Sequence, residues 1–203
     1  MSEKVVSQTD KKSSVEEYVL SERRNASRNE FMDGRVLPKP ASNRFHNLIA
    51  TNATIAIGSR LTGHKCDIYV NDMRVLLNQK RICYPDVVIV SGEPAFTDRS
   101  QEILINPTVV VDVFSSETNS TLKNEKLESY LAMESIRECL LVKEDEMRVE
   151  HFFKQNAKQW IYRIYNERDD VISIESINCK LSLAELYAQI KFREAEISSR
   201  AVN

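Results

Sequence analysis

Residues 84–90 read Tyr-Pro-Asp-Val-Val-Ile-Val, and residues 108–114 read Thr-Val-Val-Val-Asp-Val-Phe. Both stretches are short, apolar and rich in β-branched side chains, which is typical of buried β-strands. Each carries one carboxylate, Asp86 in the first stretch and Asp112 in the second. An unpaired carboxylate is costly in a buried strand. Two of them on neighbouring strands predict an oxygen-ligand site for a hard divalent cation, whose charge offsets their repulsion.

Each aspartate also has a structural interpretation, which the sequence leaves open. Asp86 follows a proline and could cap a turn, whereas Asp112 could accept from a backbone amide or pair with a buried arginine. The functional interpretation rests on the pair, and on the polar run Ser-Ser-Glu-Thr at 115–118 that follows the second strand. Strand ends that precede a crossover loop are where open α/β sheets usually place their chemistry.

The composition indicates one domain. The chain has 203 residues, of which 42% are hydrophobic and 29% charged, and this is enough for a single core. We expect a disordered tail at 1–12, a single domain over 13–192 and a second tail at 193–203. The net charge of −2 gives no overall attraction to nucleic acid or to an anionic membrane, so DNA binding would need a local basic patch.

The chain carries no sign of membrane insertion or export. No window approaches 18 apolar residues and no signal-peptide core is present, so we expect a cytoplasmic protein. The cysteines are far apart and form no C-x-x-C pair, which indicates small buried hydrophobic side chains, with a disulfide or a zinc site as the alternative. These cysteines are Cys66, Cys83, Cys139 and Cys179.

Turn and capping signals place the elements of the first half. Ser14 and Glu17 form a capping box, which predicts a short helix. Asp33-Gly34 lies between two apolar-containing arms and predicts a β-hairpin over 29–37 with a type I′ turn. Apolar positions at helical spacing predict a helix over about 43–61, and a long extended segment follows it.

The pattern changes period after Ser115. A helix is predicted over 119–135, and we expect it to be the crossover between the strand of Asp112 and a buried strand at 139–142. Further strands are predicted at 147–153, 160–165 and, more weakly, 171–174, with an amphipathic helix over 181–190. This order of elements predicts an α/β fold with a mixed sheet.

Helix, three strands, helix and strand, with Pro-Asp on the second strand and an acid on the third, resembles the core of the PD-(D/E)XK nuclease superfamily, the restriction endonuclease-like fold. Within it, the chain is similar to the bacterial Uma-type endonucleases. The matching segments are Glu30 to Gly34 for E-L-I-D-G, His46 for the helix-opening His, 84–88 for the Y-P-D strand, 111–115 for V-E-V-L-S, Glu125-Lys126-Leu127 with Tyr130 for E-K-L and Tyr, and 183–187 for the C-terminal helix. The resemblance implies a mixed β-sheet flanked by helices, with an N-terminal hairpin and additional C-terminal antiparallel strands.

The resemblance also implies a catalytic site that hydrolyses DNA phosphodiester bonds. In that site Asp86 and Asp112 are ligands of Mg²⁺ or Mn²⁺, and Lys126 is the positive group near the attacking water. Glu30 and His46 are additional candidates. A carboxylate-held Mg²⁺ suits this reaction because it lowers the pKa of water and clamps a phosphoryl oxygen. We expect a homodimer, since cutting both strands of a duplex calls for two sites related by symmetry.

Three positions depart from the family pattern. The chain has Asp112 where the family usually has Glu, Phe114 where the superfamily usually has lysine, and Leu122 where an Asp is common. A catalytically degraded nuclease fold that serves as a nucleic-acid or protein interaction module is therefore the alternative function. The alternative for Lys126 is a solvated helix charge.

Basic residues around the hairpin form a loose cluster, namely Arg23, Arg24, Arg28, Arg35, Lys39 and Arg44. Within this cluster Arg35 and Arg44, together with Lys123, are the candidates for contact with a DNA backbone. A merely solvated surface explains these residues equally well. His46 opens a helix and could contact a phosphate or move a proton, and its alternative is a structural hydrogen bond near the helix start.

Overall fold

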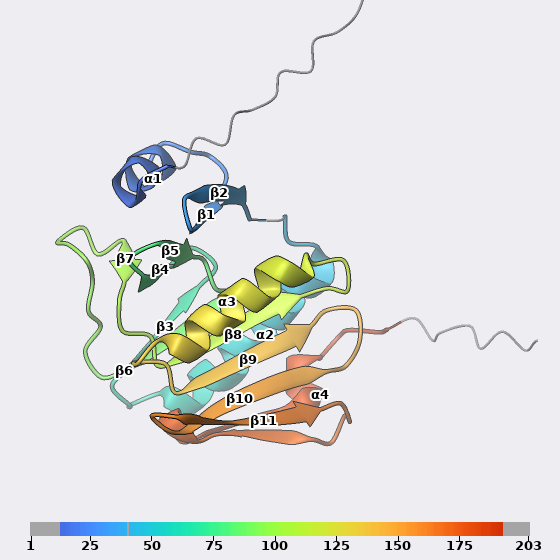
Figure 1. Cartoon of the computed structure of the whole chain (residues 1–203). Helices are drawn as coiled ribbons and strands as arrows, with labels where there is room; N and C mark the ends of the chain where they lie inside the picture. The colour runs from blue at the N-terminus through green and yellow to red at the C-terminus, as the bar shows by residue number, and fades with distance from the viewer. Residues whose placement is uncertain (1–12, 40, 193–203) are drawn as a thin grey trace, which may run out of the picture.

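The computed structural model describes residues 13–39 and 41–192, so both predicted tails lie outside the described residues. The strands form three sheets (Figure 1). The central, six-stranded sheet has the order β11 (Gln159–Tyr165), β10 (Val149–Asn156), β9 (Glu138–Lys143), β8 (Val109–Phe114), β6 (Val87–Ser91) and β3 (Cys66–Val70).

The centre of this sheet has the predicted connections. Strand β8 runs antiparallel to β6 and parallel to β9. A tight hairpin turn cannot join two parallel strands, so β8 and β9 need a crossover connection. Helix α3 (Ser120–Ala132) supplies this connection, as predicted. Strands β10 and β11 form the predicted antiparallel pair. The mixed α/β fold predicted from the sequence is therefore confirmed.

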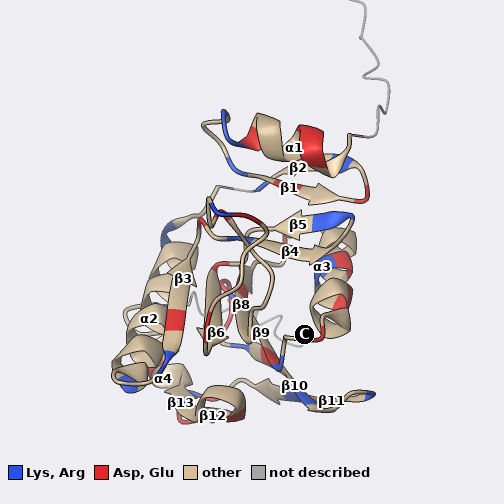
Figure 2. Cartoon of the chain, turned by 90° about the vertical axis from the view of Figure 1, so that its left-hand side faces the viewer, with Lys and Arg blue, Asp and Glu red and all other residues tan. Residues whose placement is uncertain are grey.

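Two helices cover opposite faces of the central sheet, α2 (Arg44–Leu61) on one side and α3 on the other (Figures 1 and 2). Side chains alternate between these faces along each strand. In β8, Val111 and Val113 belong to the core beneath α2, whereas Val110 and Phe114 belong to the core beneath α3. Asp112 therefore points to the α3 side.

The predicted hairpin is present, with β1 (Asn29–Met32) paired to β2 (Arg35–Pro38). Asp33 and Gly34 have φ of 54° and 89°, the two positive values that a type I′ turn requires. The hairpin belongs to the five-stranded sheet, with the order β2, β1, β5 (Arg81–Cys83), β4 (Arg74–Asn78) and β7 (Ile103–Leu104).

Helix α1 (Val15–Glu22) packs on this second sheet. Ser14 and Glu17 form both bonds of the predicted capping box. The rings of Tyr18 and Phe31 stack with 5.2 Å between their centroids, and both side chains are buried. The hairpin that carries Glu30 is thereby fixed beside the central sheet.

The predicted C-terminal helix over 181–190 is present only in part. Leu181 lies in strand β13 (Cys179–Ser182), which pairs with β12 (Val171–Ile174) after a 3-10 turn, η1 (Glu175–Ile177). Helix α4 spans only Leu183–Leu186 and is capped by Ser182. Cys179 and Leu181 are buried at the strand spacing of two residues, so the helix begins at Leu183, two residues later than predicted.

The start of the predicted strand at 84–90 also needs correction. Strand β6 begins at Val87, so Asp86 precedes it and lies at its N-terminal end. Because β6 is antiparallel to β8, this end lies at the same edge of the sheet as the second half of β8.

The four cysteines are unpaired, and Cys83, Cys139 and Cys179 are buried as expected. None of the helices in the described part of the chain has the length and apolar character to cross a membrane.

Candidate active site

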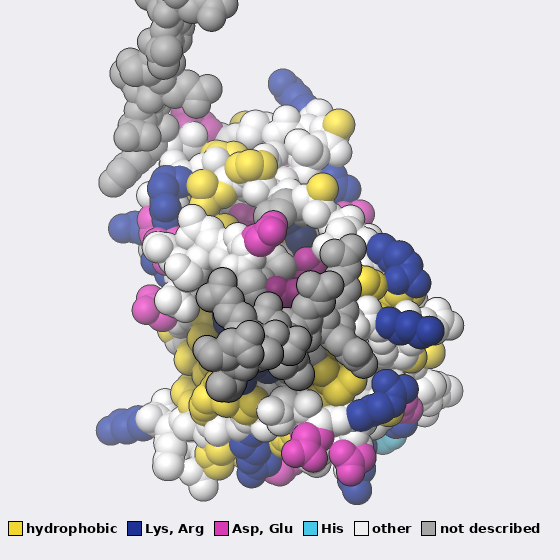
Figure 3. Space-filling model, turned by 90° about the vertical axis from the view of Figure 1, so that its right-hand side faces the viewer, with side chains coloured by type: hydrophobic (Ala, Val, Ile, Leu, Met, Phe, Trp, Pro, Cys, Tyr) yellow, Lys and Arg dark blue, Asp and Glu magenta, His cyan; other side chains and the backbone are white. Residues whose placement is uncertain are grey.

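A cavity of about 380 Å³ contains the predicted acidic residues. Figure 3 shows the face at which α2 and α3 begin, with Asp and Glu side chains near its middle and Lys and Arg side chains along its edges. Six of the charged or titratable residues that line the cavity lie on or next to strands of the five-stranded and six-stranded sheets, or on α2 and α3. They are Glu30, Lys39, His46, Asp86, Asp112 and Lys126.

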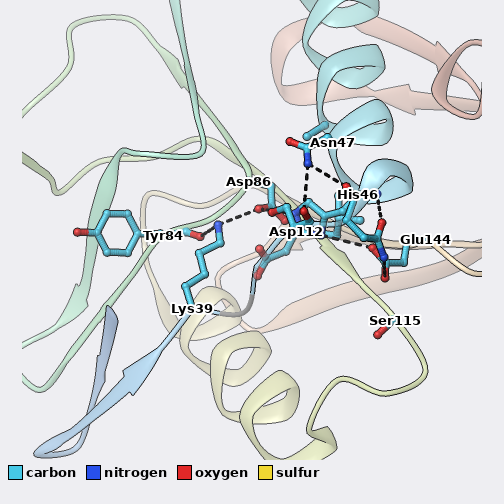
Figure 4. A network of polar contacts seen from close by, with 12 residues as sticks. Lys39, His46, Asn47, Tyr84, Asp86, Asp112, Ser115 and Glu144 are labelled. Atoms are coloured by element: carbon cyan, nitrogen blue, oxygen red, sulfur yellow. Dashed lines mark hydrogen bonds and ion pairs between the residues drawn. The ribbon is translucent and has the colours of Figure 1, made fainter. Parts of the chain in front are cut away.

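Asp86 is almost wholly buried, and both of its carboxylate oxygens have close partners (Figure 4). Oδ1 lies 2.8 Å from Lys39 Nζ and 2.9 Å from His46 Nε2, and Oδ2 accepts the Val113 N–H at 2.8 Å. His46 Nε2 is within ion-pair distance of Oδ1, but the geometry is not that of a hydrogen bond. Burial disfavours the ionised carboxylate, but His46 and Lys39 outweigh it and hold the pKa of Asp86 well below its usual range.

Asp112 is held from above by α3. Its Oδ2 accepts the Tyr130 hydroxyl at 3.0 Å and lies 2.8 Å from Lys126 Nζ. These two partners are four residues apart and so lie on one face of the helix. Burial raises the pKa of Asp112 against the opposing charge of Lys126, and the nearby carboxylates of Asp86 and Glu30 raise it further.

Lys126 bridges two carboxylates. Besides Asp112, its Nζ contacts Glu30 Oε1 at 3.0 Å, and only 13% of the side chain is exposed. Burial favours the neutral amine, but Asp112 and Glu30 outweigh it and raise the pKa of Lys126 well above its ordinary value. Lys126 is therefore a charged member of the site, and the alternative of a solvated helix charge is wrong.

His46 is positioned by the start of α2. The Asn43 side chain accepts the His46 backbone N–H at 3.0 Å, which caps the helix and fixes its first turn. The ring lies between Asp86 and Glu144, with Nδ1 3.6 Å from Glu144 Oε2. Burial lowers the pKa of His46, but Asp86 outweighs this effect and the net shift is upward.

Phe114 occupies the position at which the superfamily usually has a lysine, and a lysine from α3 lies against its ring. The ring of Phe114 lies 3.7 Å from Lys123 Nζ, which also lies 3.4 Å from Glu150 Oε2. Phe114, Leu122 and Lys123 all line the cavity. A positive charge is thus held near Phe114 by cation–π attraction, although it comes from α3.

Two of the three residues predicted to contact nucleic acid, Arg35 and Arg44, do not line the cavity. Arg35 pairs with Glu125 at 2.7 Å, and the Arg44 guanidinium lies 5.6 Å from the centre of the Phe45 ring. Lys123 is the member of the three that lines the cavity. Figure 2 shows Lys and Arg residues spread over several elements rather than in one stripe.

Lys39 and Glu144 belong to the site, but reasoning from the sequence did not assign them to it. Lys39 was one member of the loose basic cluster, and nothing in its local pattern indicates that its side chain reaches Asp86. Its position directly after the hairpin is the signal that could have been used. Glu144 directly follows β9, and its contact with His46 spans two elements that are far apart in the sequence.

Carboxylate oxygens are suitable ligands for Mg²⁺ or Mn²⁺. No donor reaches Asp112 Oδ1 from the described residues, so this oxygen is free to bind a ligand. Within 13–39 and 41–192, however, no three His, Cys, Asp or Glu side chains are grouped closely enough to hold a metal ion. Lys39 contacts the carboxylate of Asp86, and Lys126 contacts that of Asp112. The residues fit a cation that is bound by two aspartates and completed by water, as is usual for Mg²⁺.

This fold is that of the restriction endonuclease-like superfamily. Residues 15–185 match the family described as "Uma2: Putative restriction endonuclease". The chain belongs to the Uma2 family.

Two relatives from Synechocystis sp. (strain ATCC 27184 / PCC 6803 / Kazusa) are uncharacterized proteins. The protein sll1609 is 30% identical over 146 residues, which cover 71% of this chain and 82% of that protein. The protein slr1290 is 24% identical over 182 residues, which cover 89% and 94%.

The fold is also similar to the crystal structure of a protein from Anabaena variabilis, described as a "putative nuclease belonging to DUF820". The TM-score is 0.70 over 86% of this chain and 97% of that one. At 16% identity this similarity establishes the fold alone.

Proposed function

We propose that this protein is an endonuclease that hydrolyses DNA phosphodiester bonds with Mg²⁺ or Mn²⁺. The observation that carries the proposal is the convergence of Asp86, Asp112 and Lys126 on one cavity. Membership of the family described as "Putative restriction endonuclease" supports the same reaction class.

In this proposal Asp86 and Asp112 hold the cation. When bound, the cation supplies Lewis acidity, which lowers the pKa of a water molecule and offsets charge on the phosphoryl oxygens. Lys126 places a fixed positive charge where negative charge develops. Glu30 orients the Lys126 ammonium, and Tyr130 holds Asp112 through its hydroxyl.

Cleavage of supercoiled plasmid DNA tests the proposal. We expect nicked and linear products with Mg²⁺ or Mn²⁺, none with EDTA, and a loss of at least about 100-fold in rate for Asp112→Asn, a size typical of removing a group that stabilises the transition state. Asp72→Asn is the matched control, because Asp72 is an exposed aspartate outside the cavity. The absence of cleavage with both cations on plasmid, linear and single-stranded DNA would contradict the proposal.

A nuclease fold that binds without cutting is the second candidate. The observation that favours it is the pairing of both aspartates with lysines, together with Phe114 and Leu122 at two positions of the family pattern. If this second function is correct, the protein binds DNA or a protein partner, and Asp86→Asn does not weaken that binding. Millimolar Mg²⁺ or Mn²⁺ then does not raise the melting temperature. A ligand that binds only the folded state must raise that temperature, so the melt separates the two functions.

A homodimer is part of the first proposal, because cutting both strands requires two symmetry-related sites. Light scattering on the purified protein tests it. A monomeric mass at all concentrations, both free and with bound duplex, would argue against double-strand cutting by one assembly.

A further inference from the structure

Lys39 has a different position in the site from Lys126. It follows strand β2 of the hairpin, and its backbone N–H donates to the Arg28 carbonyl at 2.8 Å. Its side chain enters the cavity, where Nζ contacts Asp86 Oδ1 and the Tyr84 carbonyl, both at 2.8 Å. Only 14% of this side chain is exposed (Figure 4). A lysine from the five-stranded sheet thus neutralises an acid of the central sheet.

The two oxygens of Asp86 are not equally available to a ligand. Oδ2 is engaged by the Val113 N–H, a backbone group that cannot leave without opening the edge of the sheet. Oδ1 is engaged by the side chains of Lys39 and His46. A cation that approaches Asp86 therefore reaches Oδ1, where it meets the Lys39 ammonium.

Lys39 is also the lysine that is more easily displaced. Lys126 lies between two carboxylates, Asp112 and Glu30, on a buried helix face. Lys39 contacts one carboxylate and one neutral carbonyl, and it extends from a segment outside the central sheet. Two positive charges close to one carboxylate oxygen repel each other, so a divalent cation and the Lys39 ammonium compete for Asp86 Oδ1.

Resting on the function proposed above, we propose that Lys39 occupies the cation position at Asp86 in the cation-free protein and competes with the divalent ion for it. Lys39 is in this sense a positioning residue: it holds the buried carboxylate of Asp86 in place until a divalent ion replaces the ammonium. Cation affinity is then set partly by this lysine and not by the aspartates alone.

Titration calorimetry with Mn²⁺ tests the competition. We expect Lys39→Met to bind Mn²⁺ about tenfold more tightly than the wild-type protein or better, because the competing ammonium is gone. Lys123→Met is the matched control: Lys123 lines the same cavity but contacts Glu150 rather than Asp86, so its removal tests a general loss of positive charge. We expect its affinity to stay within about threefold of the wild type, a change of well under 1.4 kcal/mol.

Lysine labelling gives a second measurement that needs no variant. With saturating Mn²⁺, we expect amine-reactive labelling of Lys39 to rise several-fold in the wild-type protein, while Lys143, which pairs with Glu146 outside the cavity, stays unchanged. Equal Mn²⁺ affinity of Lys39→Met and the wild type, or unchanged labelling of Lys39 at saturation, would overturn the competition. If the wild type also cleaves DNA with Mn²⁺, only this inference fails. If neither protein binds Mn²⁺ and no cleavage occurs, the proposed function fails as well.

Discussion

Asp86 Oδ2 accepts the backbone N–H of Val113 at 2.8 Å. Val113 directly follows Asp112, and Asp86 directly precedes Val87, which pairs with Val111 across the two strands. This bond therefore ties the first acid to the strand that carries the second. The spacing of the two carboxylates is set by the backbones of adjacent strands, which makes the pair a preorganised site.

The first prediction concerns the buried pair of Asp112 and Lys126. Asp112→Asn leaves the Lys126 ammonium buried with one carboxylate fewer, and breaking a buried pair in this way typically costs about 3–5 kcal/mol. We expect the unfolding free energy to fall by an amount at the lower end of this range, since Glu30 still contacts Lys126. Urea unfolding measures it. Glu125→Gln, which breaks the exposed pair with Arg35, is the control and should cost about 1 kcal/mol or less.

Stability near neutral pH should depend on His46. Its pKa is raised in the folded protein, so its stabilising contribution is fully present below about pH 6.5, the value of an unperturbed His. That contribution is lost as the pH rises through the higher folded-state pKa. His46→Gln should therefore flatten the fall in unfolding free energy above pH 6.5, whereas His64→Gln, at an exposed position, should not. Identical pH profiles for wild type and His46→Gln would contradict this assignment.

Asp86 should contribute to the fall in unfolding free energy at acidic pH. Its folded-state pKa is lowered, so its contribution is present above about pH 3.9, the unperturbed value, and is lost as the pH falls through the folded-state pKa. The stability advantage of the wild type over Asp86→Asn should be constant near pH 5–6 and should shrink below about pH 3.9. Asp72→Asn serves as the exposed reference. An advantage that grows on acidification would show that the carboxylate is stabilised in its protonated form.

The hairpin turn should be sensitive at Gly34. Its φ of 89° lies in the region that favours glycine, so Gly34→Ala should destabilise the protein by about 1–2 kcal/mol. A strained turn weakens the pairing of β1 with β2, so hydrogen exchange of the backbone amides in both strands should become faster in Gly34→Ala. The same hairpin carries Glu30 and leads into Lys39. Gly58→Ala is a useful comparison, since Gly58 lies within α2 and a Cβ there would meet Ile68 at an ordinary 3.5 Å. Equal losses for both variants would contradict the turn argument.

Local chemistry in the sequence predicted most elements of this fold. The capping box at Ser14, the turn at Asp33-Gly34 and the alternation of apolar residues each specify structure over a few residues, and each was confirmed. The start of the predicted C-terminal helix was wrong, because Leu181 and Ser182 belong to strand β13 and short apolar runs fit both periods. Pairing with β12, which is not visible locally, decided in favour of a strand.

The site residues within the apolar strand segments could be predicted from the sequence. Those whose side chains reach the cavity from distant segments could not. Asp86 and Asp112 were identified because charges are conspicuous in apolar strands. Lys126 and Glu30 came from the resemblance to a family, and in the structure Lys126 contacts both Asp112 and Glu30. Lys39 contacts Asp86 across 47 positions of sequence, and no local pattern encodes such a contact.

Anomalous diffraction from a crystal soaked in Mn²⁺ tests most directly whether Asp86 and Asp112 together hold a divalent cation. We expect one strong peak in the cavity, with carboxylate oxygens of both residues at about 2.0–2.6 Å from the ion, and with Lys39 Nζ displaced from Asp86. A saturating soak that leaves no peak there, with Lys39 still bound to Asp86 and Lys126 to Asp112, would contradict this expectation.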